Sequence, residues 1–290
     1  MTVDLCTVNY NTKKELDRHI KALISDVDFP EENYMGTGFL RHDRPILPWS
    51  LHIADNGSTE DNSRMYLERA MVPENVCLNQ NIGYARACNQ LATLGDGDII
   101  GLLNSDVWMT TAQVQQVQRT FDEHPEVDIL GPKQRDETGA VVHGGIFGTN
   151  TAPKFRGWKQ SDIYDELYRD LLPAVTVSGS AYFVRRTVWE ALTNDEEYQA
   201  VIRQLMTEGL IRPDALRYPG AFLPTMHYYE ETFCSYFARH RGYGVFYDGR
   251  VSIGHSWHAS HEVGSPQDML FHESQATFRR ACDMLGIERD

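Results

Sequence analysis

Oxygen-bearing side chains follow an apolar segment in the first half of the chain, where they could bind a metal ion or a polar ligand. The segment from Ile99 to Leu103 is almost entirely apolar, and it ends abruptly in Asn104, Ser105 and Asp106. An apolar run of this length between turn residues is typical of a strand that is buried on both faces. A hard divalent cation prefers oxygen ligands and bridges readily to phosphate oxygens. Asp106 could therefore bind a metal ion or a ligand, or it could simply cap the following helix.

Three further polar clusters follow short apolar segments in the same half of the chain. They are Asn9 and Asn11 after residues 3–8, Asp55 and Asn56 after residues 51–54, and Asn81 and Gly83 after residues 76–78. Each cluster alone is more readily explained as a helix cap or a turn, above all at Asn56 and Ser58. If the segments form a parallel sheet, however, all four clusters lie at the edge where small ligands bind. Together they predict a ligand site at that edge.

A single aspartate is a weak metal site, so Asp106 needs a partner from elsewhere in the chain. His255 follows the apolar residues 251–254 and is the best candidate in the second half. His258 and His261 lie close by in the sequence and remain alternatives. A lone histidine is more often a surface or core residue than a metal ligand, so the spacing alone does not decide among them.

The adjacent acids Glu230 and Glu231 are the best candidates for acid–base chemistry. An acid pair is usually a solvated helix face, but this pair follows Tyr228 and Tyr229 and precedes Phe233. An apolar setting raises the pKa of a carboxyl group and suits it to act as a general base. Residues 178–180 (Ser-Gly-Ser) offer a small backbone that could lie close to a sugar or nucleotide, or could form a strand bulge.

Strands alternate with helices along the first half of the chain, which predicts βαβ units and a parallel sheet. Residues 127–130, 141–147 and 243–247 are further expected strands. Thr12 with Glu15, and Thr110 or Thr111, are expected helix caps, and a final helix should begin at Ser265–Pro266 and end near Gly286. Residues 150–173 predict a loop or partly helical excursion, and residues 194–224 predict a polar, irregular insertion.

Composition places the chain among soluble globular proteins. It has 290 residues, 41% of them hydrophobic and 23% charged, and a net charge of −14. This charge disfavours broad binding to nucleic acid or anionic membranes, although a local basic groove is not excluded. Five scattered cysteines, without a metal-binding spacing, predict buried reduced thiols. No secretion signal or apolar run of about 20 residues is evident, so we expect a cytoplasmic protein without a membrane span.

Three common phosphate and catalytic motifs are missing from the sequence. Without GxxxxGK[ST] there is no Walker-type phosphate loop, and without GxGxxG a dinucleotide-binding site is disfavoured. The GxSxG nucleophile elbow is missing as well.

The order of the motifs resembles the family 2 glycosyltransferases, particularly their rhamnosyltransferase-like branch, from Val3 to about Ser260. Any one of these motifs is weak, but seven in the family's order are specific. They are Val8-Asn9-Tyr10-Asn11, Asp55-Asn56-Gly57-Ser58-Thr59, the stretch from Asn81-Ile82-Gly83 to Asn89, Leu103-Asn104-Ser105-Asp106, the stretch from Ser178-Gly179-Ser180 to Arg186, Tyr229-Glu230-Glu231, and His255.

The resemblance implies a GT-A fold: an α/β, Rossmann-like, mixed and mostly parallel central sheet flanked by helices. Its nucleotide-sugar-binding half would span residues 1–132, its acceptor-binding and catalytic half residues 133–264, and a C-terminal helix residues 265–290. The implied donor-binding residues are Val8, Asn9, Asn11, Asp55, Asn81, Gly83, Arg86, Asn89, Asn104 and Ser105. The implied acceptor or sugar contacts are Ser178, Gly179, Ser180 and Tyr229.

The same resemblance implies the chemistry. Asp106 and His255 would bind a divalent metal, Mn²⁺ or Mg²⁺, that holds the diphosphate of a nucleotide sugar. Glu231 would deprotonate a hydroxyl acceptor for in-line attack with inversion, and Glu230 would support it. The family's usual Glu-Asp pair is Glu-Glu here, the acid two positions later is Phe233, and the arginine further along is replaced by Phe237. These departures affect acceptor recognition more than the fold.

The sequence leaves two other functions open. A nucleotidyltransferase on a related scaffold would need a basic residue near the first turn, where Lys13 and Lys14 are the nearby pair. A sugar- or nucleotide-binding module that has lost catalysis would explain the altered acid pair. The donor sugar, its nucleotide and the acceptor class do not follow from the sequence, and nucleic acid is disfavoured as an acceptor but not excluded.

Overall fold

The computed structural model describes residues 1–27, 47–70, 72–157, 168–256 and 266–289, and everything below concerns these ranges. Its helices are α1 (Lys13–Ile24), α2 (Ser63–Arg69), α3 (Tyr84–Leu91), α4 (Thr111–Glu123), α5 (Arg186–Thr193), α6 (Glu196–Thr207), α7 (Glu230–His240) and α8 (Pro266–Leu285), with a 3-10 turn at Ala215–Arg217. Its strands are β1 (Val3–Asn9), β2 (Trp49–Asp55), β3 (Asn75–Leu78), β4 (Ile99–Asn104), β5 (Val107–Trp108), β6 (Ile129–Arg135), β7 (Val141–His143), β8 (Ile146–Thr149), β9 (Ala152–Phe155), β10 (Leu171–Pro173), β11 (Ala181–Arg185) and β12 (Val245–His255).

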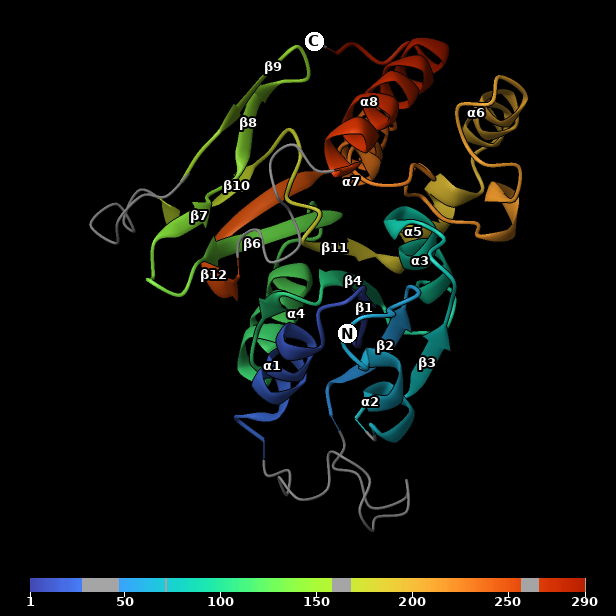
Figure 1. The fold of residues 1–290 in the computed structure, drawn as a ribbon. Helices are drawn as coiled ribbons and strands as arrows, with labels where there is room; N and C mark the ends of the chain where they lie inside the picture. Colours follow the sequence, from blue (N-terminus) through green and yellow to red (C-terminus); the bar gives the residue numbers. More distant parts are fainter. Residues whose placement is uncertain (28–46, 71, 158–167, 257–265, 290) are drawn as a thin grey trace.

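A central sheet runs through the molecule in the order β10-β12-β6-β11-β4-β1-β2-β3 (Figure 1). Strands β4, β1, β2 and β3 pair in parallel, as do β6 and β12. Along this path β11 and β10 run against the others. The expected α/β fold with a mixed, mostly parallel sheet flanked by helices is therefore confirmed, with β11 inserted antiparallel between its two parallel parts.

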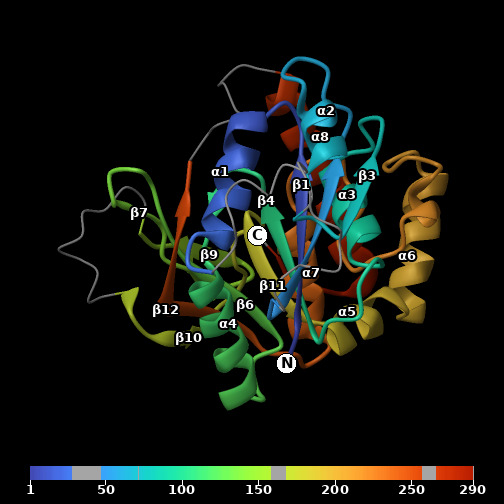
Figure 2. The same ribbon diagram turned by 90° about the horizontal axis from the view of Figure 1, so that it is seen from below.

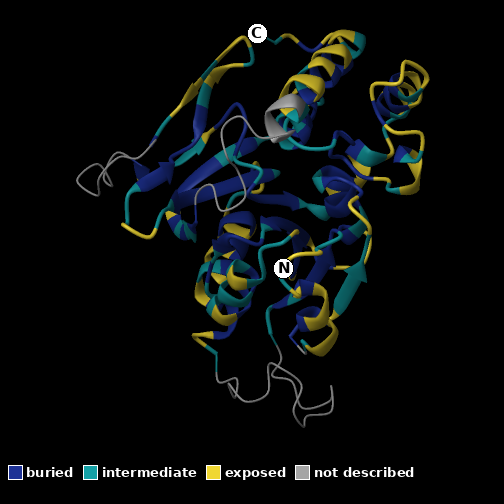
Figure 3. Cartoon of the chain, viewed as in Figure 1, coloured by how far each residue is buried: buried dark blue, intermediate teal, exposed yellow. Residues whose placement is uncertain are grey.

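Helices cover both faces of the sheet, which explains the continuous apolar sequence of β4 (Figure 2). Its residues alternate between two cores: Ile100 and Leu102 face the core shared with α3, α5, α7 and α8, whereas Ile99 and Leu103 face the core shared with α1, α2 and α4. The central strands are accordingly buried along their length (Figure 3). A strand with helices on each side has no solvent-facing side and so needs no polar alternation.

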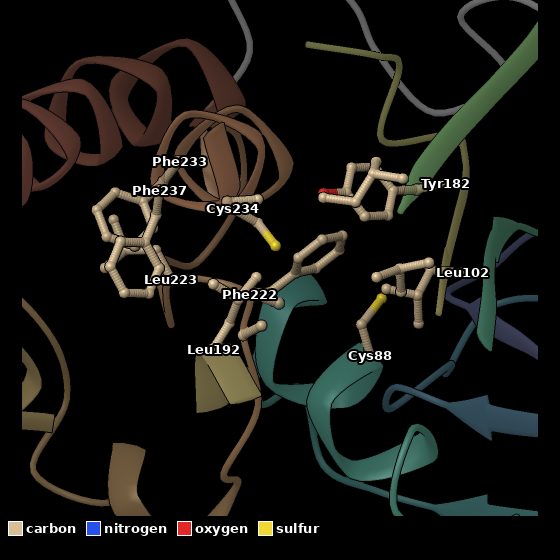
Figure 4. Close-up of a cluster of buried hydrophobic side chains, with 14 of the residues drawn as sticks. Cys88, Leu102, Tyr182, Leu192, Phe222, Leu223, Phe233, Cys234 and Phe237 are labelled. Carbon is tan, nitrogen blue, oxygen red and sulfur yellow. The ribbon is translucent and has the colours of Figure 1, made fainter. Parts of the chain in front are cut away.

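Aromatic rings fill the first of these cores beside β4 and β11. Phe222 packs edge-on against Tyr182 at 5.2 Å and against Trp189 at 5.4 Å between ring centroids. Figure 4 shows the Phe222 ring between Cys88 of α3 and Cys234 of α7. Helix α3, which precedes β11 in the sequence, and helix α7, which follows it, thus pack into one core. This core holds α7 and its acid pair in place.

Several expected elements have different bounds in the structure. Residues 196–207 form helix α6 rather than irregular chain, capped by Asp195, whose carboxylate accepts a hydrogen bond from the Tyr198 amide at 3.0 Å. The strand expected at 243–247 continues to His255 as β12, and the strand expected at 141–147 is divided into β7 and β8. Residues 150–173 contribute strands β9 and β10.

Of the helix caps predicted for α1 and α4, one is confirmed and one is wrong. Thr110, one of the two residues expected to cap this helix, forms the capping box of α4 with Gln113. Thr12 precedes α1 without a side-chain cap, because its hydroxyl donates to Asn9 Oδ1 at 2.9 Å and meets Ser105 Oγ at 2.6 Å. The predicted capping box at Thr12 is therefore wrong, and that side chain instead joins the ends of β1 and β4.

All five cysteines are free thiols, and four of them are buried, as expected. Among the described segments, no helix combines the length and apolar character that crossing a bilayer requires.

Candidate active site

A cavity of about 460 Å³ opens at the carboxyl ends of β1, β2 and β4. Its size lies within the range of small-molecule and cofactor sites. Loops after the parallel strands form one wall, and residues from the chain before α7 and from α8 form the other. The lining residues are Val8, Tyr10, Asn11, Thr12, Asn56, Glu60, Asn81, Tyr84, Asn104, Ser105, Asp106, Met226, His227 and Leu270.

Five of the residues expected to bind the donor line this cavity: Val8, Asn11, Asn81, Asn104 and Ser105. Asp106, from the expected metal pair, lines it as well. Asn9 and Asp55 instead lie beneath it and are fully buried. Asn9 Nδ2 donates to Asp55 Oδ1 at 2.9 Å, and Ser58 Oγ donates to the same oxygen at 2.5 Å. In this structure the two residues brace the loop after β2, and their direct contact with a donor stays a prediction.

The motif from Asn81 to Asn89 shapes the wall of the cavity. Gly83 has a φ of +88°, and a Cβ atom there would lie 3.1 Å from the Met226 carbonyl oxygen. Arg86 is fully buried; it donates to Asp214 at 2.7 Å and to Met226 Sδ at 3.2 Å. These contacts hold Met226 in the wall, so the geometry gives Gly83 and Arg86 a supporting position behind it.

Asn89 is likewise placed behind the cavity rather than in it. Its amide nitrogen donates to the carbonyl oxygens of Tyr218 and Phe222, at 3.3 and 3.0 Å, and its oxygen accepts from the Phe222 amide. Asn89 thus fixes residues 218–222, in the segment that leads toward the acid pair.

Strand pairing brings Asp106 and His255 together from opposite halves of the chain. Val107 of β5 pairs with His255 of β12, and the Ser256 amide donates to the Asp106 carbonyl oxygen at 2.9 Å. Gly254 permits this close pairing, because a Cβ atom there would lie 1.8 Å from the Trp108 ring. His255 Nε2 lies 3.5 Å from Asp106 Oδ1.

The polar atoms around this pair fit a divalent cation. His255 Nδ1 donates to Gln134 Oε1 at 2.9 Å, which leaves Nε2 as the ring nitrogen that could bind a metal ion. Asp106 Oδ1 is buried and makes no hydrogen bond. A buried carboxylate oxygen opposite an imidazole nitrogen is a donor set that suits Mn²⁺. No group of three or more metal-binding side chains occurs within the described ranges, so other ligands would have to be water or ligand oxygens. The alternatives His258 and His261 lie outside the described residues.

His19 supports the turn that carries Asp106. Its Nδ1 donates to the Val107 carbonyl oxygen at 2.7 Å, and the Thr7 hydroxyl lies 3.0 Å from its Nε2. Burial lowers the pKa of His19 to about 4, so its ring is neutral at physiological pH. Helix α1 is thereby joined to the residue that follows Asp106.

The acid pair begins α7, behind the wall of the cavity. Burial and then the charge of Glu231 raise the pKa of Glu230 well above its ordinary value, although Thr225 donates to it at 3.4 Å. Burial also raises the pKa of Glu231, and the Thr232 hydroxyl donates to that carboxylate at 3.1 Å. The pair therefore holds a proton to an unusually high pH.

Residues 178–180 lie between the acid pair and the cavity. A Cβ atom on Gly179 would lie 3.0 Å from both Cγ and Cδ of Glu231, so a larger residue there would displace the Glu231 side chain by a few tenths of an ångström. The Tyr84 hydroxyl, in the cavity wall, donates to the Gly179 carbonyl oxygen at 3.0 Å. The hydroxyl oxygens of Ser178 and Ser180 lie 2.8 Å apart, within hydrogen-bond distance. The Ser180 hydroxyl also donates to Gln134 Oε1 at 2.9 Å. The Ser-Gly-Ser segment thus connects the acid pair with the surroundings of His255.

The two residues before the acid pair have strained backbones. Tyr228 and Tyr229 have φ values of +71° and +67°, a region that bulky side chains rarely adopt. Tyr229 stacks on Phe278 of α8 at 5.0 Å, and Gln275 Nε2 donates to its hydroxyl at 2.9 Å. Strain of this kind costs roughly 1–3 kcal/mol per residue and persists where surrounding packing fixes it, often at functional sites.

Sequence reasoning missed several residues that shape this region. Gln134 orients His255 but carries no local signal, because a glutamine near a strand end usually faces solvent. Met226, His227 and Leu270 line the cavity from segments with no recognisable motif. Tyr84 lies within the Asn81–Asn89 motif. Its position at the first residue of α3 could have marked it as facing the strand ends.

Comparison with known proteins identifies the family and the fold. Residues 4–189 match the family model for glycosyl transferase family 2. No curated protein sequence matches the chain. A crystal structure of GalNAc-T7 with UDP, GalNAc and Mn²⁺ is similar, with 12% identity and a TM-score of 0.53; the match covers 98% of this chain and 48% of that one. A crystal structure of S. aureus TarS 1-349 in complex with UDP has 12% identity and a TM-score of 0.51, covering 98% and 65%. At such identity these likenesses show the fold, and the chain spans about half the length of the first structure.

Proposed function

Because the chain belongs to glycosyl transferase family 2, we propose that it is an inverting, metal-dependent enzyme that moves a sugar from a nucleoside diphosphate sugar to a hydroxyl acceptor. The observation that carries the proposal is the pair formed by Asp106 and His255, in which a buried carboxylate oxygen without a hydrogen bond lies 3.5 Å from an imidazole nitrogen. Asp106 also lines the 460 Å³ cavity at the strand ends.

The donor would lie in that cavity, with its diphosphate toward Asp106. Asn11, Asn56 and Asn81 offer amide groups along the wall for the nucleoside. Asp106 Oδ1 and His255 Nε2 would hold the divalent cation, Mn²⁺ or Mg²⁺, which neutralises the charge of a departing diphosphate when bound. UDP is the nucleotide to test first, because both similar structures described above contain it.

Glu231 is the proposed general base, and Glu230 its protonated neighbour. Glu231 is less buried than Glu230 and lies against Gly179, whose carbonyl oxygen accepts a hydrogen bond from Tyr84 in the cavity wall, so Glu231 is the carboxylate closer to where an acceptor hydroxyl would bind. Glu231 would take the proton of the acceptor hydroxyl as that oxygen bonds to the anomeric carbon. The bond from this carbon to the phosphate oxygen breaks on the opposite face, and its electron pair leaves with the diphosphate. Attack opposite the leaving group inverts the anomeric configuration.

The rhamnosyltransferase-like branch, and with it a hexosyl or deoxyhexosyl donor, remains part of this proposal. It rests on the order of motifs through Asp106, the Ser178–Ser180 segment and the acid pair. The nucleotidyltransferase alternative gains no support from the structure, because the Lys13 ammonium lies over the Tyr66 ring at 5.9 Å and neither Lys13 nor Lys14 lines the cavity.

The proposal is tested by assaying release of nucleoside diphosphate from a panel of nucleotide sugars with Mn²⁺ and with a chelator. We expect metal-dependent release from at least one donor, and Asp106→Asn should weaken metal-dependent donor binding. Glu231→Gln should keep donor binding and lose transfer, whereas Glu230→Gln should keep transfer. Pyrophosphate release from a nucleoside triphosphate would favour a nucleotidyltransferase, and binding without any turnover would favour a binding module. If Glu230→Gln alone abolishes transfer, the two glutamates have been assigned in the wrong order.

A further inference from the structure

Five aromatic side chains form a continuous row from the cavity to the surface. This aromatic row consists of Tyr84, His227, Tyr228, Phe271 and His272. Successive ring centroids are separated by 6.3 Å between Tyr84 and His227, 4.0 Å between His227 and Tyr228, 5.5 Å between Tyr228 and Phe271, and 5.6 Å between Phe271 and His272. Tyr84 and His227 line the cavity, so the inner end of the row belongs to its wall.

The outer end of the row exposes apolar ring surface. Phe271 is 37% exposed and His272 is exposed, although both lie on α8 next to Leu270, which lines the cavity. Phe271 also packs on Tyr229 at 5.3 Å, directly before the acid pair. The row therefore begins at the cavity wall, passes the residues that precede Glu230 and ends in solvent.

We propose that the aromatic row is an acceptor subsite that binds a pyranose ring, so that the acceptor of this enzyme is a carbohydrate. The inference rests on the proposed function, because it supplies the hydroxyl that Glu231 would deprotonate. A pyranose has an apolar face of C–H groups that packs on aromatic rings, and equatorial hydroxyls that hydrogen-bond around it. Phe271 offers a flat apolar face for the C–H groups, and the exposed His272 beside it offers a ring nitrogen for a hydroxyl.

The charges near the row favour an uncharged sugar. Glu60 lines the cavity, and Glu273 is exposed beside His272. Glu231, the carboxylate proposed as the base, lies just beyond the Tyr228–Tyr229 turn. Since like charges repel, an acceptor carrying a phosphate or carboxylate at this position would bind less well than a neutral one.

The test measures binding of neutral methyl pyranosides by saturation-transfer NMR in the presence of UDP and Mn²⁺. The probes are the methyl α- and β-pyranosides of glucose, galactose, mannose, N-acetylglucosamine and rhamnose, with methyl glucuronide as the charged comparison. Phe271→Leu keeps apolar bulk for packing but loses the flat ring, whereas Phe271→Tyr keeps the ring. Phe155→Leu changes a 73% exposed ring on the β8–β9 hairpin and is the matched control.

We expect at least one neutral pyranoside to bind, with its Kd raised about tenfold by Phe271→Leu and changed less than about twofold by Phe271→Tyr or Phe155→Leu. The proposal is overturned if no pyranoside binds the wild-type protein, if Phe271→Leu binds it as well as wild type does, or if the glucuronide binds more tightly. UDP titration of the wild-type protein tests the proposed function separately. Failure to bind UDP, together with pyranoside binding that depends on Phe271, would refute that function and leave the carbohydrate subsite standing.

Discussion

Replacing Glu230 with glutamine should raise the thermal stability of the protein at alkaline pH. The Glu230 side chain is buried, with 4% of its surface exposed, and Glu231 places a second carboxyl group beside it. Glutamine has nearly the same shape and can still accept the hydrogen bond from Thr225. The substitution therefore removes a buried charge and its repulsion while it leaves the packing almost unchanged.

The sign and the size of the effect follow from the raised pKa of Glu230. The folded state holds a proton that the unfolded chain releases, so the free energy of unfolding falls as pH rises from about 4.3, the ordinary value for glutamate, through the raised folded value. Glutamine does not titrate and escapes this loss. A poorly compensated buried group costs roughly 1–3 kcal/mol, so we expect Glu230→Gln to gain about 2 kcal/mol at pH 8.5, or roughly 4–8 °C in Tm, and little at pH 5.

The assay is thermal unfolding of wild type and variant at half-unit steps from pH 5 to 8.5. Glu208→Gln is the control, because Glu208 is an exposed carboxylate paired with Arg280 at 2.6 Å. Hydrogen bonding to Arg280 lowers the pKa of Glu208 to about 2, so the stability it contributes is lost only in acid. Its variant should therefore differ from wild type by a constant amount over this range. The reasoning is refuted if Glu230→Gln melts at or below the wild-type temperature at pH 8.5, or if the difference does not grow with pH.

Three further changes probe the supports of the site. Gln134→Met should raise the Kd for Mn²⁺ in the presence of UDP about 10–100-fold, because His255 loses the acceptor of its Nδ1–H; calorimetry showing an unchanged Kd would contradict this. Gly179→Ala should lower kcat roughly 100-fold at unchanged UDP affinity, since the added methyl group displaces Glu231; full activity in a steady-state assay would show that the side chain relaxes without consequence. His19→Gln should flatten the loss of stability between pH 6.5 and 4, because wild type folds with a neutral imidazole of pKa about 4 while the unfolded chain is protonated. Parallel Tm–pH curves of variant and wild type would count against that explanation.

Much of the fold could be predicted from periodicity and turn residues, because local patterns report burial directly. The apolar run at Ile99–Leu103 indicated a strand covered on both faces, and the structure places helices there on each side. The antiparallel insertion of β11 could not be predicted in this way, since Ala181–Arg185 has the same pattern for either direction of pairing. Helix α6 was missed although Tyr198, Val201, Ile202 and Leu205 repeat at helical spacing and are all buried. The polar residues on either side of this helix obscured its helical spacing.

The site was harder to predict than the fold, because its parts come from segments distant in the sequence. The proximity of Asp106 and His255 depends on pairing between β5 and β12, which a two-residue strand does not signal. Asn9 and Asp55 have the residue types and positions of ligand contacts, and in the structure they hydrogen-bond to each other and brace a loop. A polar residue after a strand can serve either purpose, and only the three-dimensional hydrogen-bond partners distinguish them. The metal and catalytic roles stay predictions until they are measured.

The insertion of β11 also has a consequence for how the chain is made. Strand β4 ends at Asn104, whereas the partner that covers its second edge begins at Ala181. At ~5–20 residues per second, a ribosome needs roughly 4–15 s to add the intervening segment. During that interval the most apolar strand of the nascent protein has one open edge, which can pair with other chains. Slowing translation between these two strands should therefore increase aggregation during synthesis, whereas slowing it after β11 should not.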